Sequence, residues 1–167
     1  GTYSSNTVDG VSAWVPTNNE RMLYFDVPSS FRFGTNPVYI KIDYYDVGRG
    51  RLVVQYDSAL GAATTDSYQP AEIHTRSSRV GSGQWVTSYQ AFKSPLLANR
   101  QNGATDFRMR LVGEVGPPLQ VSAVTIGTEP FADERMQFIL SEPWLQPYTG
   151  EVRDWVDAKG LRGKVMA

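Results

Sequence analysis

The chain has 167 residues, enough for one domain of ordinary size or one domain with part of another. Its 16 basic and 17 acidic residues nearly cancel, so we expect neither a nucleic-acid partner nor a membrane partner. The absence of cysteine excludes disulfides, thiolate chemistry and cysteine-type zinc sites. No apolar run reaches the roughly 20 residues of a membrane-spanning helix, whereas a hydrophobic share of 41% suffices for a genuine core.

Alternating residues in the first half of the chain predict β-strands. Residues 11–15 and 21–27 form short apolar segments that end at prolines. The clearest segment, residues 38–58 (VYIKIDYYDVGRGRLVVQYDS), alternates apolar and polar side chains on both sides of two glycines. Because glycine supplies the positive φ angles of a tight connection, we predict that this segment forms a β-hairpin with one buried face. The pattern indicates an antiparallel all-β protein.

The second half of the chain continues this pattern to residue 128. Residues 59–83 are polar and rich in Gly, Ser and Thr, and they predict at most one edge strand around Ile73. Turn residues separate three further alternating segments, at residues 85–92, 106–112 and 119–126. Together the segments predict an antiparallel jelly-roll β-sandwich of about eight strands over residues 1–128.

Several short sequences within residues 22–126 resemble jelly-roll modules attached to bacterial polysaccharide-degrading enzymes. They are LYFDV at 23–27, the predicted hairpin, the strand that begins at Trp85, and NRQNG at 99–103 followed by DFR at 106–108. The resemblance implies a non-catalytic carbohydrate-binding module of a multimodular glycoside hydrolase, with a polysaccharide or oligosaccharide as its ligand. It also implies a bacterial protein that is secreted or held at the cell surface, which the lack of cysteine fits.

Residues 129–167 change character, since they show no sustained alternation and are interrupted by prolines. They end on the apolar sequence Val-Met-Ala, so we expect an irregular tail that leads into a further module. Leu161, Gly163, Lys164 and Val165 resemble the Leu-x-Gly-Lys-Val segment that enters the catalytic barrel of endo-α-mannosidase-like and α-1,3-glucanase-like glycoside hydrolases. The resemblance implies an intramolecular catalytic domain outside this chain as a partner of the sandwich.

A carbohydrate site needs flat aromatic rings for C–H faces and planar polar groups for neighbouring hydroxyls. We expect the rings to be Trp14 at a strand end, Tyr45 in the hairpin, and Tyr68, which should be the most exposed tyrosine. The expected polar groups are those of Arg100, Gln101, Asn102 and Asp106. Another interpretation stays open, in which residues 99–103 form a structural turn capped by Asp106 and Trp14 packs over one end of the sandwich. Five arginines hint at an acidic glycan: Arg49, Arg51, Arg76, Arg79 and Arg100.

A structural calcium ion is common in jelly-roll modules, where carboxylates and backbone carbonyls hold it. Asp9, Asp43 and Asp46 offer oxygen ligands for such an ion, and they could equally be solvated acids. The sequence contains no EF-hand loop, and we expect no catalytic metal.

No nucleophile-elbow, phosphate-binding-loop or zinc-protease motif is present, and His74 is the only histidine. We therefore expect this chain not to be an enzyme. Two other functions stay open. The sandwich could be a structural spacer that packs on the catalytic barrel without binding sugar. It could also be a small jelly-roll polysaccharide lyase that uses Arg49, Arg51, Tyr45 and His74.

Overall fold

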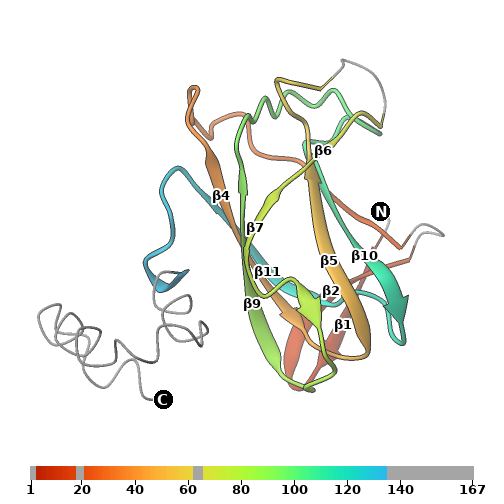
Figure 1. The fold of residues 1–167 in the computed structure, drawn as a ribbon. Coiled ribbons are helices and arrows are strands. Elements are labelled where there is room, and N and C mark those ends of the chain that lie inside the picture. Colours follow the sequence, from red (N-terminus) through yellow and green to blue (C-terminus); the bar gives the residue numbers. More distant parts are fainter. Residues whose placement is uncertain (1–2, 18–20, 62–65, 135–167) are drawn as a thin grey trace, which may run out of the picture. The chain divides into compact units, whose positions relative to one another are not determined.

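The computed structural model describes residues 3–17, 21–61 and 66–134 (Figure 1). The chain divides into two units, Gly1–Glu129 and Pro130–Ala167, and all the strands described belong to the first. The predicted tail, residues 129–167, lies almost wholly outside the described residues, so its likeness to a barrel entry stays a prediction. Among the described residues, no helix is long and apolar enough to cross a membrane.

Eleven strands lie in the described residues, and they pair antiparallel in two sheets. The six-stranded sheet has the order β1 (Tyr3–Val8), β2 (Val11–Pro16), β11 (Val121–Gly127), β4 (Val38–Tyr45), β9 (Trp85–Phe92) and β7 (Glu72–Thr75). The five-stranded sheet has the order β3 (Leu23–Phe25), β10 (Phe107–Val115), β5 (Arg49–Tyr56) and β6 (Gln69–Pro70), and β8 (Ser78–Arg79) also pairs with β5. The two sheets form a β-sandwich (Figure 1), which confirms the all-β antiparallel class. The strands exceed the expected eight because β1, β6 and β8 carry no apolar alternation.

The segment that predicted a hairpin forms two strands in different sheets. β4 pairs with β9 and β11, whereas β5 pairs with β10, β6 and β8. The predicted hairpin is therefore wrong, although its alternation is right: every second residue of β4 is buried, and so are Leu52, Val54 and Tyr56 of β5. Alternation shows which side of a strand is apolar. It does not show whether two strands are hydrogen-bonded neighbours in one sheet or lie in opposite sheets with their apolar sides facing across the core.

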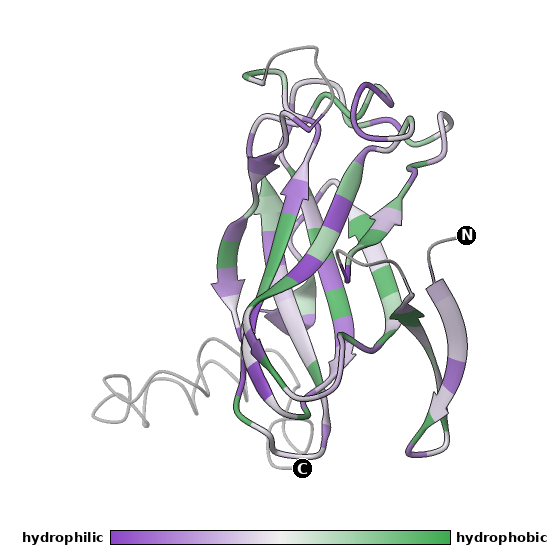
Figure 2. Ribbon diagram, turned by 90° about the vertical axis from the view of Figure 1, so that its right-hand side faces the viewer, coloured by the Kyte–Doolittle hydropathy of each residue, from purple (hydrophilic) through white to green (hydrophobic). Residues whose placement is uncertain are grey.

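Aromatic rings join the two sheets across this core. Tyr56 of β5 stacks on Phe92 of β9 with ring centroids 4.5 Å apart, and Phe92 meets Phe107 of β10 at 5.6 Å. Each buried side chain of this size contributes about 1.5–3 kcal/mol to stability. Apolar and polar residues alternate along the long strands (Figure 2), so the apolar sides face the interior of the sandwich.

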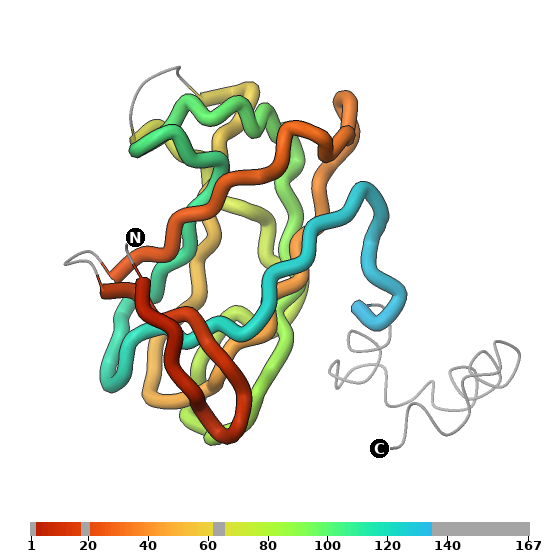
Figure 3. The backbone as a smooth tube through the Cα atoms, turned by 180° about the vertical axis from the view of Figure 1, so that it is seen from behind, coloured from red at the N-terminus to blue at the C-terminus, as the bar shows by residue number. Residues whose placement is uncertain are grey.

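The β1–β2 hairpin is loosely joined to the rest of its sheet. Within the described residues, β2 pairs with β11 through one residue pair, Trp14 with Val121. Figure 3 shows this hairpin, in red, on the near side of the sandwich. Its outer strand β1 is exposed along almost its whole length, which explains why the polar sequence YSSNTV gave no strand prediction. The separation leaves a groove beside β3, the edge strand of the five-stranded sheet.

The connections between strands gather at two ends of the sandwich. At one end they join β3 to β4, β5 to β6 and β9 to β10, and we name it the Asp57 end after the buried acid that follows β5. At the other end they join β4 to β5, β8 to β9 and β10 to β11, and we name it the Asp46 end after the buried acid that follows β4.

Candidate functional site

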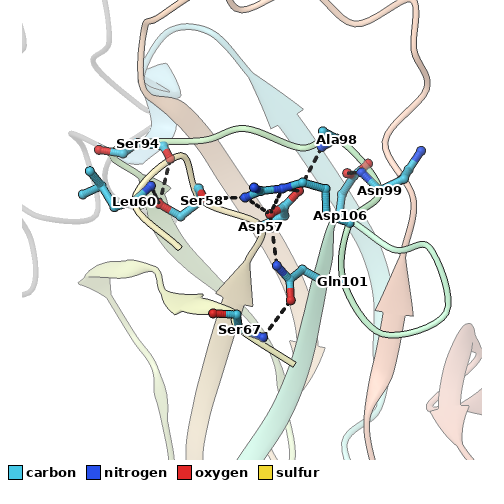
Figure 4. Close-up of polar contacts among 10 residues, drawn as sticks. Asp57, Ser58, Leu60, Ser67, Ser94, Ala98, Asn99, Gln101 and Asp106 are labelled. Atoms are coloured by element: carbon cyan, nitrogen blue, oxygen red, sulfur yellow. Dashed lines mark hydrogen bonds and ion pairs between the residues drawn. The ribbon is translucent and has the colours of Figure 1, made fainter. Parts of the chain in front are cut away.

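Most of the predicted polar residues lie at the Asp57 end, where the buried carboxylate of Asp57 binds Arg100 and Gln101 (Figure 4). The Arg100 Nη2 donates to Asp57 Oδ1 at 2.8 Å and to the Ser58 carbonyl at 2.8 Å, while the Ala98 N–H donates to Asp57 Oδ2 at 3.0 Å. Burial raises the pKa of Asp57, but the hydrogen bonds from Arg100, Ala98 and Gln101 outweigh it and hold the pKa below its ordinary value. The Arg100 guanidinium is thus bound within the protein, with 24% of its side chain exposed.

Gln101 and Asp106 are also bound internally. Gln101 is 2% exposed, and its Oε1 accepts the N–H of Ser67 at 2.7 Å. Asp106 is 0% exposed and accepts the N–H groups of Val27 at 2.8 Å and Asn99 at 2.9 Å. Burial, together with the neighbouring carboxylate of Asp26, outweighs these two hydrogen bonds and raises the pKa of Asp106. Neither side chain is accessible to a ligand in this arrangement, which favours the structural-turn interpretation of this loop.

Tyr68 is buried rather than solvent-facing. It is 7% exposed, so the expectation that it is the most exposed tyrosine is wrong. Its hydroxyl lies 2.6 Å from Thr105 Oγ1, and the guanidinium of Arg108 packs over its ring, 4.4 Å from the centroid. Burial raises the pKa of Tyr68. The polar sequence around Tyr68 concealed this contact, because a cation over a ring face leaves no apolar pattern in the sequence.

Tyr45 lies at the Asp46 end and is half-buried. Its ring meets that of Trp85, with centroids 5.3 Å apart at an angle of 57°. Trp85 is likewise half-buried, and its indole Nε1 is covered without a hydrogen-bond acceptor among the described residues. The pair offers a small aromatic surface without planar polar partners in the described contacts.

The three acids predicted near a calcium ion do not gather into one cluster in the part of the chain that the structure describes. Asp46 is 3% exposed, and its carboxylate accepts the backbone N–H groups of residues 80–82 at 2.8, 3.0 and 3.2 Å. These donors would have to be displaced before a cation could bind. Asp43 accepts the Thr87 hydroxyl at 2.6 Å, and Asp9 lies in the β1–β2 turn. Among the described residues, no group of three or more His, Cys, Asp or Glu could hold a metal ion.

A groove of about 210 Å³ lies between the β1–β2 hairpin and β3, and six residues line it: Tyr3, Trp14, Leu23, Tyr24, Phe25 and Asp26. Leu23 is buried, whereas Tyr3 is 54% exposed. The rings of Trp14 and Phe25 meet edge to face, with centroids 6.2 Å apart. Asn102 lies next to the groove, because its Nδ2 donates to the Tyr24 hydroxyl at 3.2 Å.

The groove combines aromatic surface with polar groups in the way that a ligand site requires. Of the predicted residues it contains Trp14 and has Asn102 beside it, whereas Tyr45, Arg100, Gln101 and Asp106 are not among its lining residues. Sequence reasoning missed Tyr3 and Asp26. A signal for β3 was present in the run LYFD, where three large apolar residues precede an acid, but the role of β1 carried no signal.

The four residues of the lyase alternative are divided between the sheets. Tyr45 and His74 belong to the six-stranded sheet, and Arg49 and Arg51 to the five-stranded sheet. His74 Nε2 lies 4.0 Å from Glu72 Oε2 on the same strand, β7. Acid–base catalysis needs these groups around one substrate atom, and their division between two sheets does not by itself bring them there.

No protein-family model, curated protein or solved structure matches this chain. Its function has to be inferred from its own residues. The groove is a concave aromatic feature formed by residues that the structure describes, so it carries the inference.

Proposed function

We propose that this chain is a non-catalytic carbohydrate-binding module of the jelly-roll type. It would hold an attached glycan-degrading enzyme near its polysaccharide, outside or at the surface of a bacterial cell. Such a module raises the local substrate concentration through weak, reversible contacts. The attached catalytic domain would be its intramolecular partner.

The observation that carries this proposal is the aromatic groove. Tyr3 and Trp14 line it from one sheet, and Tyr24 and Asp26, which carry a hydroxyl and a carboxylate, line it from β3 and the residue that follows β3 in the other. Sugars offer apolar C–H faces and directional hydroxyl groups, so rings and carboxylates side by side suit them. A volume of about 210 Å³ is smaller than the roughly 300–1,000 Å³ of sites that enclose a drug-sized ligand. The groove would therefore contact one or two sugar rings of a longer chain.

The sheet orders support the jelly-roll part of the proposal. Along the chain, the long strands alternate between the sheets: β4 is in the six-stranded sheet, β5 in the other, β9 in the first, β10 in the second and β11 in the first. This alternation wraps the chain around one core, as jelly-roll sandwiches do.

Native gel electrophoresis in gels that contain neutral or acidic polysaccharides tests the proposal. The wild-type chain should be retarded by at least one polysaccharide relative to a gel without it. Trp14→Ala should weaken that binding about tenfold, the equivalent of about 1.4 kcal/mol. Tyr3→Ala should weaken it too, and this exposed residue can be truncated with little effect on folding.

Trp85→Ala is the matched control, because Trp85 is also a half-buried tryptophan of the six-stranded sheet but lies outside the groove. Its retardation should equal that of wild type. Loss of binding in Trp85→Ala with full binding in Trp14→Ala would move the site to the Tyr45–Trp85 pair. No retardation by any polysaccharide would contradict a binding function.

A structural spacer is the second candidate function, and the loop network at the Asp57 end favours it. The polar side chains that predicted a sugar site here make hydrogen bonds within the protein instead: those of Arg100, Gln101 and Asp106. A spacer should raise the melting temperature of the whole enzyme without changing its retention on polysaccharide. Comparing the enzyme with and without residues 1–129 separates the two functions.

A further inference from the structure

Three arginines share the outer side of the five-stranded sheet, and we name them the basic face: Arg51, Arg108 and Arg110. Arg108 and Arg110 of β10 alternate with the buried Phe107 and Met109, so the two arginines point away from the core. Arg110 is opposite Val53 of β5, which places Arg51 at the diagonal position two residues along. Such diagonal neighbours lie about 7–8 Å apart, within reach of long side chains.

No hydrogen bond or ion pair found among the described residues includes the side chain of Arg110. Its Nε is buried without a hydrogen-bond partner, as is that of Arg79, but Arg79 donates from its other nitrogens to the carbonyls of Pro117 and Arg49. Arg108, by contrast, donates from Nε to Gln55 Oε1 at 2.9 Å and forms an ion pair with Asp66. The covered Nε is not itself open to a ligand, but Arg110 is half-buried and the rest of its guanidinium has no acceptor among the described residues, so an anionic ligand can supply one.

The charges around Arg110 leave this face positive. Glu114, the acid nearest to Arg110 along β10, is engaged with Arg21, their atoms 3.0 Å apart. Arg51 is exposed, and none of the ion pairs found among the described residues includes it. The chain as a whole carries a net charge of −1, so the positive charge of this face is local rather than general. Local charge of one sign attracts a ligand of the other sign.

We propose that the basic face binds the anionic groups of an acidic polysaccharide, through Arg110 and Arg51. This inference rests on the proposed carbohydrate-binding function and names its ligand class. Guanidinium groups match carboxylate and sulfate groups with two parallel hydrogen bonds, which a lysine cannot offer. Tyr24 connects the basic face to the groove, because it lines the groove and is also paired with Arg108 in the sheet. A single glycan chain can therefore cross β3 from the groove to Arg110.

Native gels with four polymers test this inference: polygalacturonate, a sulfated galactan, a neutral glucan and single-stranded DNA. Wild type should be retarded by polygalacturonate, by the sulfated galactan or by both. The first alone assigns uronate carboxylates, the second alone assigns sulfates, and retardation by both assigns anionic groups in general. Arg110→Gln should weaken the retardation about tenfold, the scale of one charge-assisted hydrogen-bonded pair. Raising the salt from about 0.05 M to about 0.5 M should weaken it as well, since exposed charges are screened.

Two further variants keep the test independent of folding and of net charge. Arg51→Gln removes an exposed side chain of the same face and should also weaken binding. Arg32→Gln removes the same charge from the β3–β4 connection, where Arg32 is exposed, and should leave binding unchanged. Mobility in gels without polymer corrects for the altered charge of each variant.

The outcomes separate this inference from the function on which it rests. Retardation by the neutral glucan alone, lost in Trp14→Ala, would keep the carbohydrate function and overturn the basic face as its anion site. Acid-polymer binding that is equal in wild type and both face variants would overturn it too. Stronger retardation by DNA than by either acidic polysaccharide would overturn the ligand class. No retardation by any polymer would overturn both proposals.

Discussion

The two ends of the sandwich hold their buried charges in different ways. At the Asp57 end, a buried carboxylate is paired with the guanidinium of Arg100, and Ser58 and Gln101 complete the network. At the Asp46 end, the buried acid and the buried arginine are bound mainly by backbone groups instead. The residue types of a polar loop therefore do not show whether its side chains can bind a ligand, because side-chain or backbone groups of the protein can already be bonded to them.

The Asp46 end shows how backbone groups bind charge. The Arg79 guanidinium donates to the carbonyls of Pro117 at 3.0 Å and Arg49 at 3.1 Å, and so joins the β10–β11 connection to the start of β5. Burial lowers the pKa of Arg79, although nearby Glu114 and Asp46 favour its charged form. Charged side chains here replace the hydrogen bonds that the connecting backbone cannot make to itself.

Removing the acid at each end should give the largest measurable difference between them. Asp57→Ala takes a fully buried carboxylate from a charged partner and should lower the free energy of unfolding by about 3–5 kcal/mol. Asp46→Ala frees backbone N–H groups that water can reach more easily in a loop, and should cost about 1–3 kcal/mol. Urea unfolding measures both.

Asp43→Ala serves as the control for these two variants, because Asp43 is half-buried and accepts one hydroxyl, that of Thr87. It should cost about 1 kcal/mol. Equal losses for Asp57→Ala and Asp46→Ala would show that pairing with a guanidinium adds nothing to what backbone donors provide.

The sequence predicted the strands with apolar alternation and failed where stability comes from other contacts. Alternation correctly indicated the buried sides of β4 and β5, because burial on one side of a strand imposes a period of two. It could not indicate which strands pair, because that depends on whether the connection between two strands returns to the same sheet or crosses to the other, as it does between β4 and β5. The polar loop at residues 99–103 and Tyr68 were interpreted as ligand contacts because internal partners distant in sequence, such as Asp57 and Arg108, leave no local pattern.

The candidate site was predictable in part. Trp14 was identified from its place at a strand end, yet its neighbours in the groove come from β1 and β3, which the sequence does not bring together. The polar strand β1 pairs with β2 through its backbone, and backbone pairing needs no particular side chains.

Two glycines test how closely the backbone is packed at each end. Gly48 at the Asp46 end has φ +75°, and Gly103 at the Asp57 end has φ +73°. Alanine at either position should cost about 1–2 kcal/mol for the left-handed conformation. At Gly48 the added Cβ would lie 2.4 Å from the Val115 carbonyl oxygen, so Gly48→Ala should cost about 1–3 kcal/mol more. The added Cβ at Gly103 meets no described atom within 4 Å.

Thermal or urea unfolding of the two variants under the same conditions gives this comparison directly. A loss in Gly103→Ala as large as that in Gly48→Ala would mean that the connections at the Asp46 end can move apart at little cost. That result would contradict the close packing of β4–β5 against β10–β11.

The smallest expected effect is a difference in pH dependence between two acids of the same end. Burial raises the pKa of both Asp57 and Asp106, but hydrogen bonds reverse the sign for Asp57 alone, so its folded pKa lies below 3.8 and that of Asp106 above it. The stability that ionised Asp57 contributes is present above 3.8 and is lost as pH falls through its folded pKa. Ionised Asp106 has the opposite effect: its cost is present above its folded pKa and disappears as pH falls to 3.8.

Substitution of each acid by asparagine reveals the opposite directions of the two pKa shifts. The destabilisation caused by Asp57→Asn should shrink as pH falls below 3.8, whereas that caused by Asp106→Asn should grow as pH falls toward 3.8 from above. Each change is at most about 1.4 kcal/mol per pH unit. Urea unfolding at a series of pH values measures both variants against wild type. Parallel curves would show that the guanidinium of Arg100 does not lower the pKa of Asp57 relative to that of Asp106. The contrast between the two buried acids would then rest on the geometry of their hydrogen bonds alone.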